Sequence, residues 1–92
     1  MIIRIMGEGQ FDVPEGSADS LNALDAQVEA AVQSGDDNAF AGAFAQLLER
    51  VRSAGSRLAD DALVDSDLVL PPSDSTADDV ARLLGDEGLI PG

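Results

Sequence analysis

Residues 17–55 read SADSLNALDAQVEAAVQSGDDNAFAGAFAQLLERVRSAG, and this stretch sets the expected fold class. Apolar residues recur in it at spacings of three and four, which is the period of one helix face. The first set is Leu21, Leu24, Val28, Ala31 and Val32, and the second set is Phe40, Phe44, Leu47, Leu48 and Val51. This spacing predicts two amphipathic helices.

Short local signals predict where these helices begin and end. Ser17 or Asp19 suits the N-cap of the first helix, and Gly35 suits its C-terminal end. Residues 36–38 are Asp-Asp-Asn and favour a new helix N-terminus, whereas Gly55 ends the second helix. Because so few residues join the two helices, we expect them to run antiparallel as an αα-hairpin.

Short strands are expected on both sides of this helical hairpin. Residues 2–6 are mostly β-branched and apolar, a Gly-Glu-Gly turn follows, and residues 10–13 alternate polar and apolar side chains. They predict an N-terminal β-hairpin. Residues 67–70 predict a further strand, closed by two prolines, and residues 57–59 a short extended stretch. Since a bare hairpin is rarely stable, we expect a small antiparallel sheet of three strands.

A short third helix is expected near the C-terminus. Thr76 suits its N-cap, and Asp79 stands where a capping box carries an acid or amide. Val80 and the two leucines that follow would then face inward. The chain of 92 residues fits one domain, so residues 1–92 predict a single α+β domain in which the sheet packs with the αα-hairpin and the third helix.

The net charge of the chain limits which classes of macromolecule can bind to it. Eighteen acidic residues face five basic ones, all arginines, for a formal net charge of −13. Such a surface repels nucleic acid and anionic lipid headgroups, so we expect neither nucleic-acid binding nor direct insertion into a membrane. A basic protein is the natural complement. The alternative is that the charge serves solubility alone.

The residue types present argue against catalysis. The chain contains no histidine, cysteine, tyrosine, tryptophan or lysine, so the commonest general base and the thiol and amine nucleophiles are missing. We therefore expect no enzyme activity and no cofactor. No apolar run reaches the roughly 20 residues of a membrane span, and the N-terminal apolar run is too short for a signal peptide, so a cytoplasmic protein is expected.

An aspartate-rich segment is a weak candidate for a Ca²⁺ or Mg²⁺ site, because hard cations prefer carboxylate oxygens. Its carboxylates are Asp60, Asp61, Asp65 and Asp67. The apolar residues after Asp67 break the pattern of an EF-hand loop, which needs a mid-loop glycine and a closing glutamate. A solvated acidic loop with no metal is the favoured interpretation.

Two surfaces are candidates for binding a partner. One is the exposed part of the helical hairpin around Arg50 and Arg52, and the other is the apolar tail formed by Leu89, Ile90 and Pro91. The Phe40 and Phe44 stripe is open to two interpretations, ordinary core packing or a groove for a partner helix. Burial in a homodimer is a further way to cover an exposed stripe.

Three segments together resemble one protein family. They are MIIRIMGEGQF at residues 1–11, DLVLPP at 67–72 and LLGDEGLIPG at 83–92. In their order and spacing they resemble the PspA-associated (PspAA) proteins. The resemblance implies association with PspA, a helical membrane-remodelling protein of the phage-shock response related to ESCRT-III. It carries over no catalytic residues, and any recruitment to the inner face of the membrane would go through the partner.

Three hypotheses about function follow. The leading one is a non-catalytic regulatory domain that acts with a PspA-like protein in the envelope-stress response. The second is an acidic decoy that occupies a DNA-binding protein, which the net charge permits. The third is a metal-responsive module built on the aspartates of residues 60–67.

Overall fold

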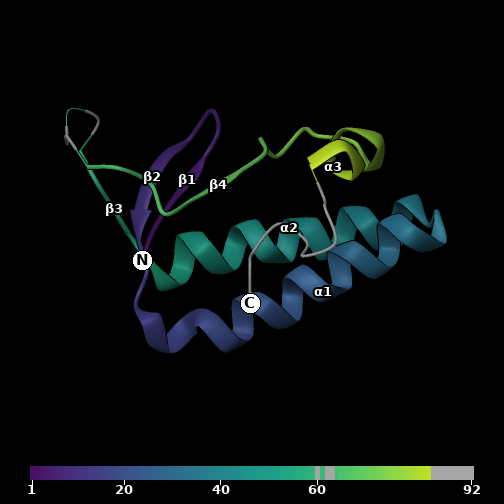
Figure 1. Cartoon of the computed structure of the whole chain (residues 1–92), viewed down its shortest axis with the longest axis horizontal. Coiled ribbons are helices and arrows are strands. Elements are labelled where there is room, and N and C mark those ends of the chain that lie inside the picture. Colours follow the sequence, from purple (N-terminus) through teal and green to yellow (C-terminus); the bar gives the residue numbers. More distant parts are fainter. Residues whose placement is uncertain (60, 62–63, 84–92) are drawn as a thin grey trace.

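The computed structural model describes residues 1–59, 61 and 64–83. The described part is α+β, with two long helices between short strands (Figure 1). Its elements are β1 (Ile2–Ile5), β2 (Gly9–Asp12), the 3-10 turn η1 (Glu15–Ser17), α1 (Ala18–Ser34), α2 (Asp37–Ala54), β3 (Ser56–Arg57), β4 (Leu68–Leu70) and α3 (Ala77–Leu83).

The helical hairpin forms where the sequence predicts it. Gly35 ends α1 in the left-handed conformation, with φ +71°, and the Asp36 carboxylate caps α2 by accepting a hydrogen bond of 3.0 Å from the Ala39 amide. Ser17 precedes α1 as expected, although its side chain makes no capping bond. Gly55 follows α2 in an extended conformation, with φ −96°, and a Cβ there would lie 2.8 Å from the Val51 carbonyl oxygen, so the position suits glycine.

The sheet differs from the prediction of three antiparallel strands. It has four strands in the order β3-β2-β1-β4, and β4 runs parallel to β1, with Ile3 opposite Leu68 and Ile5 opposite Leu70. The predicted third strand, β4, therefore pairs with β1 of the β-hairpin in parallel and not antiparallel. The fourth strand is the short β3, which pairs antiparallel with β2. A long connection makes this possible, because the chain travels from one sheet edge to the other before β4 begins.

Side-chain hydrogen bonds hold that connection against the sheet. The Gln10 amide nitrogen donates to the Val64 carbonyl at 3.0 Å and to the Ser66 hydroxyl at 2.8 Å. Gln10 is buried as a result, although it lies on the face of β2 opposite to the core. At the start of β4, the Asp67 carboxylate accepts from the Ile2 amide at 2.8 Å, and the Asp67 amide donates to the Ile2 carbonyl at 2.8 Å. These bonds fix the parallel entry of β4 beside β1.

The core lies between the inner face of the sheet and the helical hairpin. The predicted α2 stripe is buried throughout, and Phe40 stacks on Phe44 with ring centroids 5.4 Å apart. In α1, Leu21, Val28 and Ala31 are buried, whereas Leu24 and Val32 are half-buried. The sheet contributes Ile3, Ile5, Phe11, Val13 and Leu70. Every buried side-chain nitrogen or oxygen among the described residues has a hydrogen-bond partner.

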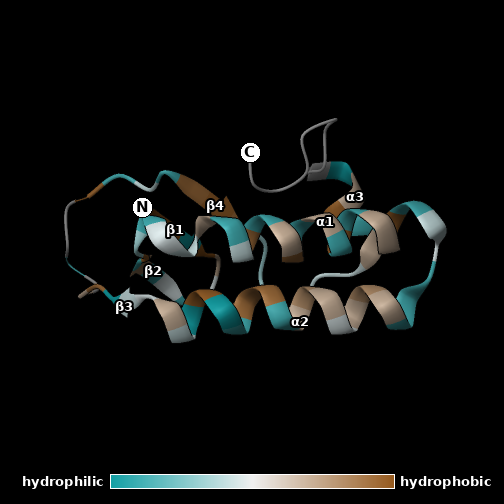
Figure 2. Ribbon diagram, turned by 90° about the horizontal axis from the view of Figure 1, so that it is seen from below, coloured by the Kyte–Doolittle hydropathy of each residue, from teal (hydrophilic) through white to brown (hydrophobic). Residues whose placement is uncertain are grey.

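The short helix α3 packs against both α1 and α2 through the fully buried Val80. Its capping box is formed as predicted, because the Thr76 hydroxyl accepts from the Asp79 amide and the Asp79 carboxylate accepts from the Thr76 amide, at 3.2 and 3.1 Å. Figure 1 shows the sheet and α3 on the same side of the helix pair, one beyond the other along its length. Figure 2 shows α1 and α2 side by side, with the apolar β4 near one end. No helix in the described ranges is both long and apolar enough to span a membrane.

Candidate partner-binding groove

Two adjoining hollows lie between α2 and the segment that leads from β4 into α3. Their volumes are about 530 and 350 Å³, and both are lined by Phe40, Ala41 and Ser75. We refer to the pair as the α2 groove. Its α2 side runs from Asp37 to Arg52, which is about 22 Å at 1.5 Å per residue. The groove is therefore about as long as four turns of a helix.

The floor of the groove combines buried aromatic rings with small exposed side chains. Phe40 and Phe44 are 4% and 3% exposed, so they belong to the core, yet both line the groove. Core packing of this stripe is therefore compatible with a groove above it. Ala41 and Ala45 are exposed along the same wall. Because alanine is small, a partner could approach the backbone of α2 closely there.

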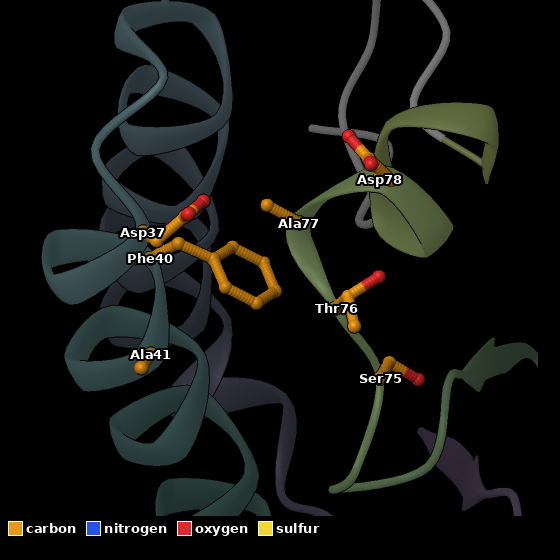
Figure 3. A pocket seen from close by; sticks show the side chains of 7 residues that line it. All are labelled: Asp37, Phe40, Ala41, Ser75, Thr76, Ala77 and Asp78. Carbon is orange, nitrogen blue, oxygen red and sulfur yellow. The ribbon is translucent and has the colours of Figure 1, made fainter.

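The rim of the groove is acidic. Asp37 on α2 and Asp78 on α3 are both exposed and line the larger hollow. Figure 3 shows them on either side of it, with the Phe40 ring between the two helices. Glu49 lines the smaller hollow and is also exposed. A ligand in the groove would therefore meet carboxylates along its length.

An ion pair closes the far end of the groove. The Arg52 guanidinium donates to both carboxylate oxygens of Glu8, at 2.7 and 2.6 Å, and lies 3.5 Å from the Glu49 carboxylate. These hydrogen bonds outweigh desolvation and hold the pKa of Glu8 below its usual value, while the pKa of Arg52 is raised. Arg57 adds a hydrogen bond of 2.8 Å to the Glu8 carbonyl. The positive charge of Arg52 is thus matched by acids within the chain.

Arg50 and Arg52, which were predicted to share one surface, lie in different hollows. Arg52 lines the α2 groove, whereas Arg50 lines a neighbouring hollow of about 430 Å³, which shares Ala45 and Glu49 with the groove. The Arg50 side chain donates to the Ser20 hydroxyl at 3.3 Å, which links α2 to α1. The predicted tail, Leu89, Ile90 and Pro91, lies outside the described residues.

The aspartate segment gives no metal centre within the described ranges. No group of three or more potential ligands gathers there, and the Asp67 carboxylate is engaged by the Ile2 amide. Asp61 and Asp65 are exposed, and Asp60 lies outside the described residues. The absence of a metal site stays a prediction.

Sequence reasoning missed two parts of this region. The first is the wall formed by Ser73, Ser75 and Asp78, because the position of α3 depends on distant contacts with α1 and α2. The second is the pairing of Glu8 with Arg52, which are 44 positions apart. The sequence indicated Arg52 only as part of a candidate partner-binding surface. With only five basic residues in the chain, an ion pair of Arg52 could be suspected. The sequence could not identify Glu8 as its partner, since each arginine has many possible acidic partners.

Comparison with known proteins gives a match to a protein family. A family model described as PspA-Associated protein (PspAA) matches residues 1–92. No curated protein and no solved structure matches the chain. Since the family match spans every element described above, from β1 to α3, the chain belongs to the PspA-associated protein family.

Proposed function

We propose that this chain is a non-catalytic interaction domain that acts with a PspA-like helical protein in the envelope-stress response. The observation that carries the proposal is the family match over residues 1–92, to a family named for association with PspA. The α2 groove supports it, because a long apolar hollow with a polar rim suits a protein segment better than a small substrate.

Neither of the described carboxyl groups with a shifted pKa is suited to act as a general acid at neutral pH. The carboxyl groups of Glu8 and Asp79 have pKa values lowered from their usual values, by hydrogen bonds from Arg52 and from Thr76 respectively. A general acid at neutral pH needs the opposite shift, toward a raised pKa. Both groups instead serve structure, one in an ion pair and one in a helix cap.

Co-elution with a PspA-like protein tests the proposal. The two proteins are mixed and analysed by size-exclusion chromatography with light scattering, at low and at high salt. We expect a complex at low salt whose stoichiometry follows from its mass, and a weaker complex at high salt because the acidic charges are screened. If the proteins elute separately at both salt concentrations, direct association is wrong.

A further inference from the structure

We propose that the α2 groove binds one positively charged amphipathic helix, about four turns long, supplied by a protein partner. This inference rests on the proposed function and adds the chemistry of the segment that is recognised. It follows from the dimensions of the groove, its lining and the sign of its charge.

The dimensions fit a helix. The wall from Asp37 to Arg52 spans about 22 Å, which matches roughly 15 residues of helix. The opposite wall is the segment from Ser73 to Asp78, which makes a turn at residues 73–74 and enters α3 at Ala77. The exposed Ala41 and Ala45 leave room for the apolar stripe of a docking helix.

The negative charge of the rim favours basic side chains on either side of the apolar stripe of that helix. Asp37, Glu49 and Asp78 are exposed carboxylates on the lining. Arg52 is the one basic side chain among the described lining residues, and Glu8 already binds it through two short hydrogen bonds. An incoming helix therefore meets net negative charge on both walls. Lysine or arginine beside its apolar stripe would complement this rim.

The same charge disfavours other occupants. Nucleic acid and anionic lipid headgroups carry the sign of the rim and are repelled by it. A second copy of this chain brings a further net charge of −13 toward the same acidic surface. A basic segment of a different protein is left as the occupant that the electrostatics favour.

Synthetic peptides of about 16 residues test the proposal on the intact chain. The first has an alanine and leucine stripe flanked by lysines, the second carries glutamate in place of each lysine, and the third scrambles the first so that no stripe remains. Binding is measured by fluorescence anisotropy at low and high salt. We expect the first peptide to bind, to weaken with salt, and to bind at least tenfold more tightly than the other two.

Two groove variants and two matched controls locate the binding site. Ala41→Trp fills the groove at an exposed position, and Ala26→Trp makes the same change at an exposed position of α1 outside it. Asp37→Asn combined with Asp78→Asn removes two rim charges, and Asp19→Asn combined with Asp65→Asn removes two exposed charges elsewhere. Each groove variant should weaken binding of the lysine peptide about tenfold, and each control less than twofold. Circular dichroism verifies that each variant is folded.

Three results would overturn the inference. They are equal binding of the glutamate peptide, equal binding of the scrambled peptide, and equal loss of affinity in groove and control variants. If a PspA-like protein co-elutes with the chain but the lysine peptide behaves in one of these ways, the groove assignment fails and the proposed function stands. If the peptide binds as expected while no PspA-like protein co-elutes, the groove assignment stands and the partner is a different basic protein.

Discussion

The two ends of the helical hairpin are held by different kinds of interaction. At the sheet end, strands from three parts of the chain cover the hairpin, and long-range side-chain bonds such as Glu8 to Arg52 and Gln10 to Ser66 join them. At the α3 end, a helix of seven residues covers the hairpin through Val80, and its cap bonds are local. A hollow separates α3 from the start of α2.

This difference suggests that one end of the hairpin provides stability and the other end binds a partner. The sheet end buries most of the large apolar side chains, so it should carry most of the stability. The α3 end borders the larger hollow of the groove and carries exposed carboxylates, so it should be the end that adapts to a partner. Four predictions follow, from the largest expected effect to the smallest.

The largest effect should come from truncating a buried valine at the sheet end. Val51 and Val80 are both 0% exposed and have identical side chains, so they form a matched pair. We expect Val51→Ala to lower the free energy of unfolding by about 2–3 kcal/mol, and Val80→Ala by about 1 kcal/mol, because α3 can shift to fill the space. Denaturant unfolding followed by circular dichroism measures both. Equal losses would show that the two ends are equally tightly packed.

Removing the Glu8 charge should have the next largest effect. Glu8→Gln breaks a bidentate, partly exposed ion pair and should cost about 1 kcal/mol at neutral pH. The pKa of Glu8 is lower in the folded chain than in the unfolded chain. The contribution of the pair is therefore complete above the unfolded value, about 4.3, and is lost as the pH falls through the folded pKa.

Thermal melting between neutral pH and pH 3 checks this prediction. The difference in melting temperature between the wild type and Glu8→Gln should shrink as the pH drops below about 4. Glu15→Gln, at an exposed position of η1, is the control and should leave the melting temperature nearly unchanged. A difference that is constant with pH would contradict the role of the ionised pair.

Loss of the α3 cap should be smaller for the whole fold and local in its effect. Thr76→Ala removes the hydroxyl that accepts from the Asp79 amide, which should destabilise α3 by about 1 kcal/mol and speed hydrogen exchange of its amides about fivefold. Thr76→Ser keeps the hydroxyl and serves as the control. Exchange that Thr76→Ala speeds in β1 and β2 as much as in α3 would contradict a local role for this cap.

The smallest effect should come from added salt. At a net charge of −13 the folded chain repels itself, so screening should raise the melting temperature by about a few degrees. The gain in protection from hydrogen exchange should be larger in α3, beside Asp78 and Asp79, than in β1 and β2. A melting temperature that is flat from low to high salt would mean that the charges are spread widely enough not to interact.

The sequence predicted the helical parts of this fold because their signals are local. Gly35, Asp36 and Thr76 act through hydrogen bonds or backbone angles within a few residues, so their roles are visible in short windows of sequence. The apolar stripes of α1 and α2 repeat over several turns, which makes the period clear. The resemblance to PspA-associated proteins was likewise carried by short segments, and the family match confirms it.

The sheet and the groove were harder to predict because they depend on distant partners. The sequence of Leu68–Leu70 fits a parallel strand as well as an antiparallel one, and its direction follows from how the connection crosses Gln10 and reaches Ile2. Ser56–Arg57 carries no apolar signal, so only an extended stretch at residues 57–59 was expected, which overlaps β3 at Arg57. The groove requires α3 to be placed beside α2, which no local pattern specifies.

Hydrogen exchange of this chain, alone and with a PspA-like protein, would place the binding surface. The account predicts slower exchange at residues 73–78 and in the first turns of α2, with β1, β2 and β3 unchanged. The contrary result is protection around Met6, Val64 and Val69, the large apolar side chains that are exposed in the described part of the sheet and its connection. That outcome would assign the partner to the sheet and would leave the α2 groove without a role in binding.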